Sequence, residues 1–239
     1  MPSPVRAHFE VLLRLPDERG GVQPAAAFLP QAERYSLMPS IDRWVIRRTV
    51  MLLGKWRREH PDSELPLCSL NLSSASLQDH DLVDILRGHL TRQQLPAEAL
   101  CFEISEVAAL ANVARASSMI EQIREVGCRI ALEDVGSGAS SFAYLKALRV
   151  NYLKIGGQLV RRVGEDAVNS AIIGALNQVG KSMGMATIAK EVDSVPSLRT
   201  LRGLGVEYAQ GHALAHPSPL TDPQGRVSIP PVFRSRSVA

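Results

Sequence analysis

The stretch IALEDVGSGASS, residues 130–141, decides the fold of this chain. Its apolar run, Ile130 to Leu132, has the character of a buried strand and ends at two adjacent carboxylates, Glu133 and Asp134. A glycine-bearing loop follows, and a helix pattern begins after the loop. A strand, an acidic pair, a loop and a helix in this order place charge at the carboxyl end of a parallel strand, as α/β enzymes do.

The acidic pair indicates a cation site. Neighbouring carboxylates repel each other unless a cation or a shared proton lies between them. The structural alternative is that Asp134 caps the helix that follows, with Glu133 as an incidental neighbour. The segment alone leaves both interpretations open.

Strand and helix patterns alternate along the rest of the chain, which predicts an α/β fold with a parallel sheet. Seven strands are expected, at residues 8–15, 65–72, 100–105, 128–134, 150–155, 185–189 and 206–210. Helices are expected at residues 24–35 (interrupted at Pro30), 40–60, 79–93, 113–126, 140–148, 165–183 and 195–204.

Composition narrows the class of protein. The 239 residues are enough for one barrel-sized domain, and the net charge of +3 is too small to indicate a nucleic-acid partner. Cys68, Cys101 and Cys128 lie in apolar runs without metal-ligand spacing, so we expect buried free thiols in a reducing compartment. Without a signal peptide or a membrane-length apolar run, we expect a cytoplasmic chain with no membrane segment.

Polar residues follow several of the expected strands at their carboxyl ends, where α/β barrels carry their chemistry. Four acids and an amide among them predict an oxygen-ligand site for Mg²⁺ or Mn²⁺, or a phosphate pocket, rather than a structural network. Arg14 is placed to face a phosphate. The strand-end residues are Glu10, Asn71, Glu103, Glu133, Asp134, Lys154, Lys190 and Gln210.

A set of short motifs then brings a family resemblance. FEVLLR at residues 9–14 resembles the signature of EAL domains, the cyclic di-GMP phosphodiesterases, with Val11 in place of alanine. The similarity covers nearly all of residues 8–220 in order. It continues through FLPQAERYSL (28–37), IDRW (41–44), LNLS (70–73), FEISE (102–106), LEDVGSGASSFAYLK (132–146), YLKIG (152–156), TIAKEV (187–192) and YAQGHALAHP (208–217).

The resemblance implies a modified TIM (β/α)8 barrel of the EAL type, whose first strand runs antiparallel to the others. Residues 1–7 are too short and proline-rich for that strand, so we expect it to be missing or truncated. The expected organisation is a lead at 1–7, the barrel at 8–220, and a tail at 221–239. This tail is either loosely held or fills the strand gap through residues 226–233, although Pro230 and Pro231 oppose a regular strand there.

By the same resemblance, family members use two Mg²⁺ or Mn²⁺ ions to hydrolyse cyclic di-GMP to a linear dinucleotide. The implied metal ligands are Glu10, Asn71, Glu103, Glu133 and Asp134. Lys154 matches a lysine that helps to hold the attacking water, and Glu106 matches a glutamate that steadies the loop at 135–141. The implied substrate-binding residues are Leu12, Arg14, Asn71 and Gln210.

Departures from the family pattern affect this site. Lys190 stands where the family has a glutamate, which changes the local charge by two units and would repel a divalent ion by several kcal/mol. Glu133 replaces an aspartate, Gly156 replaces the aspartate of KID, and His212 replaces the tyrosine of QGY. We hypothesise that Lys190 is a built-in cation pairing with Glu103, Glu133 or Asp134 in a metal-free pocket. The alternative is a lysine that extends into solvent.

These departures favour a degenerate EAL domain with little or no hydrolase activity, acting as a cyclic di-GMP receptor or a regulatory interaction module. One alternative is an active Mg²⁺- or Mn²⁺-dependent phosphodiesterase. Another is a ligand-free scaffold that docks a partner such as a PilZ-type protein. A homodimer is compatible with each of these, and whether the chain is a piece of a longer protein stays open.

Overall fold

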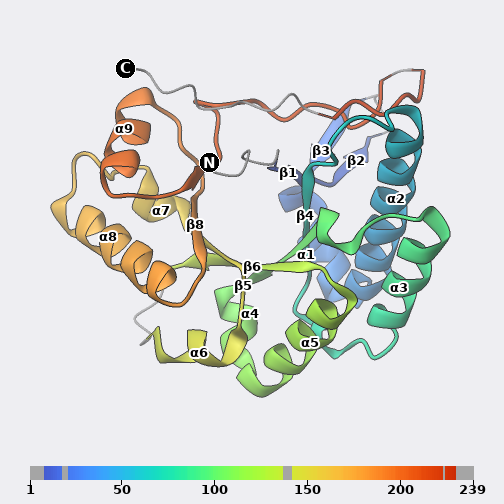
Figure 1. The fold of residues 1–239 in the computed structure, drawn as a ribbon, viewed down its shortest axis with the longest axis horizontal. Coiled ribbons are helices and arrows are strands. Elements are labelled where there is room, and N and C mark those ends of the chain that lie inside the picture. Colours follow the sequence, from blue (N-terminus) through green and yellow to red (C-terminus); the bar gives the residue numbers. More distant parts are fainter. Residues whose placement is uncertain (1–7, 18–20, 137–141, 223, 230–239) are drawn as a thin grey trace. The chain divides into compact units, whose positions relative to one another are not determined.

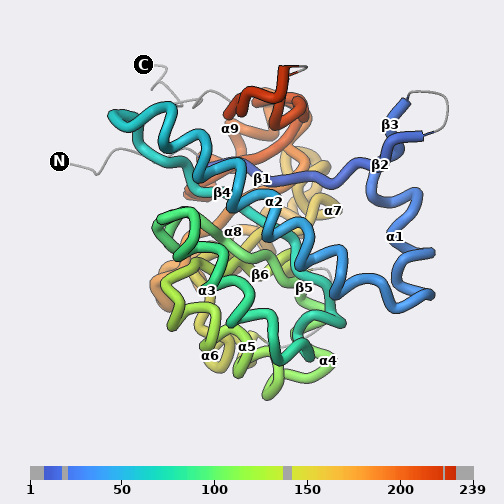
Figure 2. The backbone as a smooth tube through the Cα atoms, turned by 90° about the vertical axis from the view of Figure 1, so that its right-hand side faces the viewer, coloured from blue at the N-terminus to red at the C-terminus, as the bar shows by residue number. Residues whose placement is uncertain are grey.

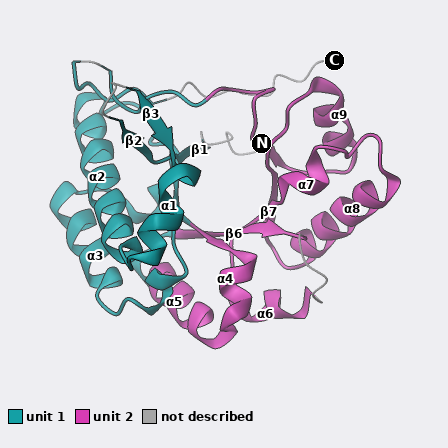
Figure 3. Cartoon of the chain, turned by 180° about the vertical axis from the view of Figure 1, so that it is seen from behind, with its two compact units in different colours: residues 1–102, 125–128, 217–239 teal, residues 103–124, 129–216 magenta. Residues whose placement is uncertain are grey.

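The computed structural model describes residues 8–17, 21–136, 142–222 and 224–229. The chain divides into two compact units (Figure 3). Unit 1 comprises residues 1–102, 125–128 and 217–239, and unit 2 comprises residues 103–124 and 129–216. Each unit has its own group of buried apolar side chains.

Unit 1 contains the N-terminal strands and helices (Figure 1). Two of its helices, α2 and α3, pack against each other through apolar side chains. Its main elements are β1 (His8–Val11), β2 (Arg14–Pro16), β3 (Val22–Pro24), α1 (Ala25–Arg34), α2 (Met38–Glu59), β4 (Leu67–Asn71), α3 (Leu82–Gln93) and the first half of β5 (Leu100–Ser105).

The first strand is shorter than predicted. β1 pairs in parallel with β4, placing Glu10 opposite Ser69, and it ends at Val11. The next strand, β2, turns away and pairs antiparallel with β3, and this hairpin lies beside α1, to one side of β1 and β4 (Figure 2). The run Val11 to Leu13 is uniformly apolar, so the sequence carried no local signal for the break. Arg14 therefore belongs to the hairpin.

Two predictions about the first helices were wrong. α1 is continuous through Pro30, which lies inside it. Proline removes one backbone donor, and in a helix of 10 residues the remaining bonds and the packing keep the helix intact. α2 starts at Met38 and not at residue 40, with Pro39 in its first turn, a favourable place for proline.

The motif at residues 41–44 has a structural role within unit 1. Asp42 is 5% exposed and accepts hydrogen bonds from the Ser73 backbone N–H (2.9 Å) and the Ser76 hydroxyl (2.7 Å). Burial raises the pKa of Asp42, and these hydrogen bonds oppose that rise. Arg43 holds Asp79 through two contacts of 2.6 and 2.5 Å. These contacts tie the start of α2 to the segment that follows β4.

Replacing Asp42 with alanine should lower the free energy of unfolding by about 2 kcal/mol, because two buried donors lose their acceptor. Asp42→Asn keeps an acceptor oxygen of the same size and should cost less than half as much. Urea denaturation of both variants measures the difference. An Asp42→Ala protein as stable as the parent would contradict this role.

Unit 2 contains the second half of β5 and the strands β6, β7, β8 and β9, whose order in the sheet is β5, β6, β7, β8, β9. Its strands are rich in buried Ile, Leu and Ala, as expected for strands covered on both faces. The elements are α4 (Glu106–Ala111), α5 (Val113–Val126, whose last residues belong to unit 1), β6 (Arg129–Val135), α6 (Leu145–Leu148), β7 (Tyr152–Ile155), α7 (Gly157–Val160), α8 (Ala167–Ser182), β8 (Ala186–Ala189), α9 (Val195–Gly203) and β9 (Tyr208–Ala209).

The seven predicted sheet strands are confirmed, but two short helices were missed. α4 follows β5 without a loop, and the Ser105 hydroxyl caps it by accepting a hydrogen bond from the Ala108 N–H at 3.2 Å. α7 has four residues, too few for a helical period to be visible. In place of the helix predicted at 140–148, the structure has a 3-10 helix (Phe142–Tyr144) followed by α6. Residues 140 and 141 lie outside the described residues.

The expected lead at 1–7 and the second half of the segment 226–233 lie outside the described residues. Of the tail that is described, Val227 is buried and forms an antiparallel bridge with Thr221. Lys55 of α2 donates a hydrogen bond to the Gly225 carbonyl at 3.0 Å. This part of the tail therefore packs on itself and on α2 within unit 1.

The three cysteines are buried and free, as predicted. Burial raises the pKa of the Cys128 thiol to about 12, so the thiol stays protonated at neutral pH. In the part of the chain that the structure describes, no helix combines the length and apolar character needed to cross a lipid bilayer.

Candidate functional site

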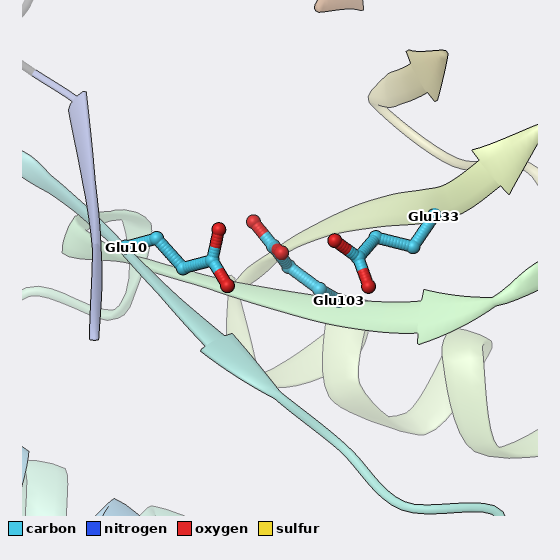
Figure 4. A group of neighbouring side chains, drawn as sticks. All are labelled: Glu10, Glu103 and Glu133. Atoms are coloured by element: carbon cyan, nitrogen blue, oxygen red, sulfur yellow. The ribbon is translucent and has the colours of Figure 1, made fainter. Parts of the chain in front are cut away.

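Unit 2 gathers acids and lysines at the carboxyl ends of its strands. Glu103 lies in β5, Glu133 and Asp134 in β6, Lys154 in β7, and Lys190 directly after β8. The carboxylate of Glu133 points toward that of Glu103, and ligand oxygens of the two lie within 4.8 Å (Figure 4). The same figure draws Glu10, which belongs to unit 1.

Lys154 is the most deeply buried cation of this cluster. Its side chain is 1% exposed and forms ion pairs with Glu103, whose side chain is 0% exposed, and with Glu133 Oε1 at 3.4 Å. Buried charges are tolerated only when they are paired and hydrogen-bonded. The predicted lysine therefore has a fixed position between two strand-end carboxylates.

A β-bulge explains how two adjacent acids reach one cation. Leu132 pairs with Leu153 and Val135 with Ile155, so Glu133 and Asp134 together oppose the single residue Lys154. On a regular strand their side chains would point to opposite faces, and a bulge re-aims them. Asp134 also has a left-handed backbone, with φ of 57°.

Lys190 lies between the two re-aimed acids. Its ammonium nitrogen is 2.6 Å from Glu133 Oε1 and 3.1 Å from Asp134 Oδ1, and its side chain is 18% exposed. Burial lowers the pKa of Lys190, but attraction and hydrogen bonding to the two carboxylates outweigh that effect and leave the pKa above its usual value. The lysine is therefore charged and does not extend into solvent.

In the cluster of unit 2, Lys190 occupies the position that a divalent ion shared by Glu133 and Asp134 would need. Mg²⁺ requires oxygen ligands at about 2.0–2.1 Å, and the ammonium of Lys190 already occupies the lone pairs of Glu133 and Asp134 that face it. An ion held by the same oxygens would lie within about 4 Å of a full positive charge, a repulsion of several kcal/mol. Gly156 lies beside Asp134, because a Cβ built on this glycine would be 3.6 Å from Asp134 Cα. As a glycine it adds no further carboxylate to the cluster.

Gln210 and its neighbours fix the segment that carries Lys190. The Gln210 N–H donates to the Ala189 carbonyl at 2.8 Å, and the Val192 N–H donates to the Gln210 carbonyl at 3.0 Å. A Cβ at Gly211 would lie 2.2 Å from the Val192 carbonyl oxygen, so only glycine allows this approach. The backbone of Gln210 thus restrains residues on both sides of Lys190.

Several residues of this region were missed at the sequence level. Glu191 has a left-handed backbone (φ of 56°) and pairs with Arg161 Nε at 2.8 Å. A Cβ at Gly157 would lie 2.4 Å from the Glu191 carboxylate, so this pair needs a glycine beside it. No local sequence pattern links Arg161, Gly157 and Glu191. The one feature of the sequence that could have indicated them is Glu191 itself, a charged residue at a left-handed position that favours glycine.

Glu106 was predicted to steady the loop at 135–141, most of which lies outside the described residues. It is 2% exposed and accepts a hydrogen bond from the hydroxyl of Tyr144, in the 3-10 helix Phe142–Tyr144 that follows the loop. Burial, then the neighbouring Glu106 carboxylate, raises the pKa of Tyr144, so its hydroxyl remains a donor. The loop role stays a prediction.

Unit 1 brings together two of its predicted site residues. The Asn71 side-chain amide, at the end of β4, donates to Glu10 Oε1 of β1 at 2.7 Å. Leu12 is 42% exposed in the link after β1. Arg14 is exposed in the hairpin, and its guanidinium donates to the Leu13 carbonyl at 3.0 Å.

Comparisons with known proteins agree with this architecture. The family model described as "EAL domain" matches residues 1–217, and the chain therefore belongs to the EAL domain family. It is similar to "Cyclic di-GMP phosphodiesterase PdeB" of Shewanella oneidensis, with 36% identity over 91% of this chain and 25% of the relative. It is also similar to "Cyclic di-GMP phosphodiesterase PdeF" of Escherichia coli, with 30% identity over 90% of this chain and 28% of the relative. The chain thus spans about a quarter of the length of these curated relatives.

Solved structures share the fold. The EAL domain of FimX from Pseudomonas aeruginosa bound to c-di-GMP has a TM-score of 0.83 and 32% identity, covering 91% of this chain and 86% of that one. The c-di-GMP complex of the phosphodiesterase PaMucR has a TM-score of 0.81 and 29% identity, covering 88% and 84%. The predicted EAL-type α/β barrel fold is confirmed by these similarities.

The pairing of Lys154 with Glu103 can be tested by stability. Lys154→Met should lower the free energy of unfolding by about 3–5 kcal/mol, because it leaves a buried carboxylate without its cation. Adding Glu103→Gln should recover part of the loss and give a coupling energy of about 2 kcal/mol. Chemical denaturation of the parent, both single variants and the double variant measures this coupling.

The exposed ion pair between Arg124 and Glu121 (3.3 Å) is the matched control. Its double-mutant cycle should give less than about 1 kcal/mol. Equal coupling energies for the buried and exposed pairs would contradict the importance of Lys154.

Proposed function

We propose that this chain is a cyclic di-GMP receptor domain with little or no phosphodiesterase activity. The observation that carries the proposal is the position of Lys190, whose ammonium contacts Glu133 and Asp134 at 2.6 and 3.1 Å. The relatives PdeB and PdeF are named as cyclic di-GMP phosphodiesterases, and the FimX EAL domain is described as bound to c-di-GMP. Membership of the same family supports this ligand for the present chain.

The charge of the cluster supports binding without metal ions. Cyclic di-GMP carries two phosphodiester charges, which a purely acidic pocket would repel. In unit 2 the acids Glu103, Glu133 and Asp134 face the ammonium groups of Lys154 and Lys190, so most of the negative charge is compensated. A glutamate in place of Lys190 would leave four carboxylates and one ammonium group, and would need metal ions to offset them.

The same arrangement argues against rapid hydrolysis. Metal-dependent phosphodiester cleavage uses the ions to generate hydroxide and to neutralise charge on the phosphoryl oxygens. Here Lys190 holds the carboxylates that such ions would need, and an ammonium group does not lower the pKa of water as a divalent metal does. Binding and turnover are therefore separated in this chain.

A second candidate is an active Mg²⁺- or Mn²⁺-dependent phosphodiesterase. The acids at positions 10, 103 and 134 are retained, and so are Asn71 and Lys154, with Asn71 hydrogen-bonded to Glu10 at 2.7 Å. For this activity, an arriving metal ion would have to displace the Lys190 ammonium from Glu133 and Asp134. A ligand-free scaffold, for example for a PilZ-type partner, is the third outcome that the following experiment distinguishes.

Titration calorimetry with cyclic di-GMP, in EDTA and then in excess Mg²⁺ or Mn²⁺, separates these functions. We expect binding in EDTA, little change on adding metal, and intact nucleotide when the mixture is analysed by chromatography. Release of linear dinucleotide at rates typical of enzymes, about 1 per second or faster, would support the phosphodiesterase and overturn the receptor. Absence of heat in both buffers would support the scaffold.

Reversal of the charge at position 190 tests the role of the lysine directly. Lys190→Glu should raise the affinity for Mn²⁺, without nucleotide, by about tenfold or more, because a repulsive ammonium becomes a ligand. It should also weaken cyclic di-GMP binding in EDTA. Electron paramagnetic resonance of Mn²⁺ reports the first effect.

Lys190→Met is the control, since it removes the charge without adding an oxygen ligand. It should bind Mn²⁺ less tightly than Lys190→Glu. If Lys190→Glu binds Mn²⁺ no better than the parent chain, the lysine is not what keeps metal from the cluster.

A further inference from the structure

Unit 2 has a second polar region, at the amino ends of β7 and β8. A hollow of about 430 Å³ opens there, next to Asn151, which precedes β7, and Met185, which precedes β8. The acid and lysine cluster lies at the carboxyl ends of the same strands. A four-residue strand spans roughly 13 Å, so the hollow is separate from that cluster.

The charged side chains that line the hollow are all basic. Arg124 comes from the end of α5, Lys146 from α6, and Arg149 from the residue that ends α6. Neither Lys146 nor Arg149 forms an ion pair with any carboxylate of the described residues. Within the described parts of the chain, Arg124 pairs only with exposed Glu121 at 3.3 Å, a contact that contributes little. The hollow therefore has unneutralised positive charge.

The backbone of Arg149 adds a second observation. Its φ is 47°, in the left-handed region where a helix end normally has glycine or asparagine. An arginine there costs about 1–2 kcal/mol relative to the right-handed conformation. A strained backbone that directs a cation toward a hollow is the kind of outlier from which a binding function is inferred.

Apart from Asn151, the rest of the lining is apolar. Met183 and Met185 flank Gly184, and no atom lies within 4 Å of a Cβ built on that glycine. Thioether side chains pack well against aromatic rings. Asn151 accepts a hydrogen bond from the Ile130 N–H at 2.9 Å through its side-chain oxygen, which orients the amide at the edge of the hollow and leaves its N–H₂ group to donate.

We propose that this hollow binds a small organic phosphate with an aromatic part, of the size of a nucleoside monophosphate. Arginine and lysine provide charge-assisted hydrogen bonds to phosphate oxygens. Met183, which is partly exposed, provides surface for the ring above the buried Met185, and the volume lies within the range of small-molecule pockets. The site does not depend on what binds at the carboxyl ends of the strands.

Calorimetry with adenosine 5′-monophosphate, adenosine and inorganic pyrophosphate tests the site in the intact chain. Adenosine 5′-monophosphate should bind more tightly than either partial probe. Lys146→Gln combined with Arg149→Asn should weaken its binding by about tenfold or more, since two charge-assisted contacts are lost. Asparagine is chosen because it tolerates the left-handed backbone, so that loss of charge is not confused with misfolding.

The matched control is Arg199→Gln with Arg202→Gln, which removes the same charge from exposed positions of α9. It should change the affinity less than about twofold. Lys190→Met should likewise leave the affinity for adenosine 5′-monophosphate unchanged. Conversely, the Lys146 and Arg149 double variant should leave the affinity for cyclic di-GMP unchanged. These two results keep the hollow distinct from the cluster at the other strand ends.

Backbone amide NMR shifts locate the bound nucleotide. Shifts should concentrate at residues 149–151 and 183–185. The proposal is overturned if adenosine 5′-monophosphate does not bind at about 1 mM, if the control loses as much affinity, or if pyrophosphate binds equally well. Shifts confined to Glu133, Asp134 and Lys190 would also overturn it.

Discussion

The candidate site of unit 2 depends on one ammonium group shared by two adjacent carboxylates. Glu133 and Asp134 are consecutive, so an ordinary strand would point them to opposite faces of the sheet. The bulge in β6 and the left-handed backbone of Asp134 bring both toward Lys190. Two carboxylates brought together repel each other unless a cation lies between them. The chain supplies that cation itself, from the residue that follows β8.

The second lysine makes this arrangement a network. Lys154 is almost completely buried and contacts both Glu103 and Glu133, while Glu133 also contacts Lys190. Removing any one member takes a partner from at least one other buried or half-buried charge, which is why such networks are sensitive to single substitutions. The backbone bonds between Gln210 and residues 189 and 192 hold Lys190 where the network needs it.

Family membership fixes the fold more firmly than it fixes the chemistry. The matched relatives are about four times longer than this chain, so the activity in their names belongs to much longer proteins. Lys190 and Gly156 both alter the charge around Asp134. Unit 2 also has basic side chains at the amino ends of its strands, opposite the cluster of paired acids and lysines. The two ends of one sheet therefore differ in charge and in the ligands they suit.

The sequence by itself determined the seven sheet strands, most of the helices and the set of charged residues at strand ends, because apolar periodicity and turn residues are local properties. It also indicated that Lys190 would disturb a metal site. The end of β1 at Val11, the unbroken α1 and the four-residue α7 were decided by packing, which local patterns do not encode. The bulge, the choice of Glu133 and Asp134 as partners of Lys190, and the pairs of Tyr144 with Glu106 and Arg161 with Glu191 join residues at least 20 positions apart. Only the register of the folded strands brings such residues together, because each contact depends on where the neighbouring strand ends.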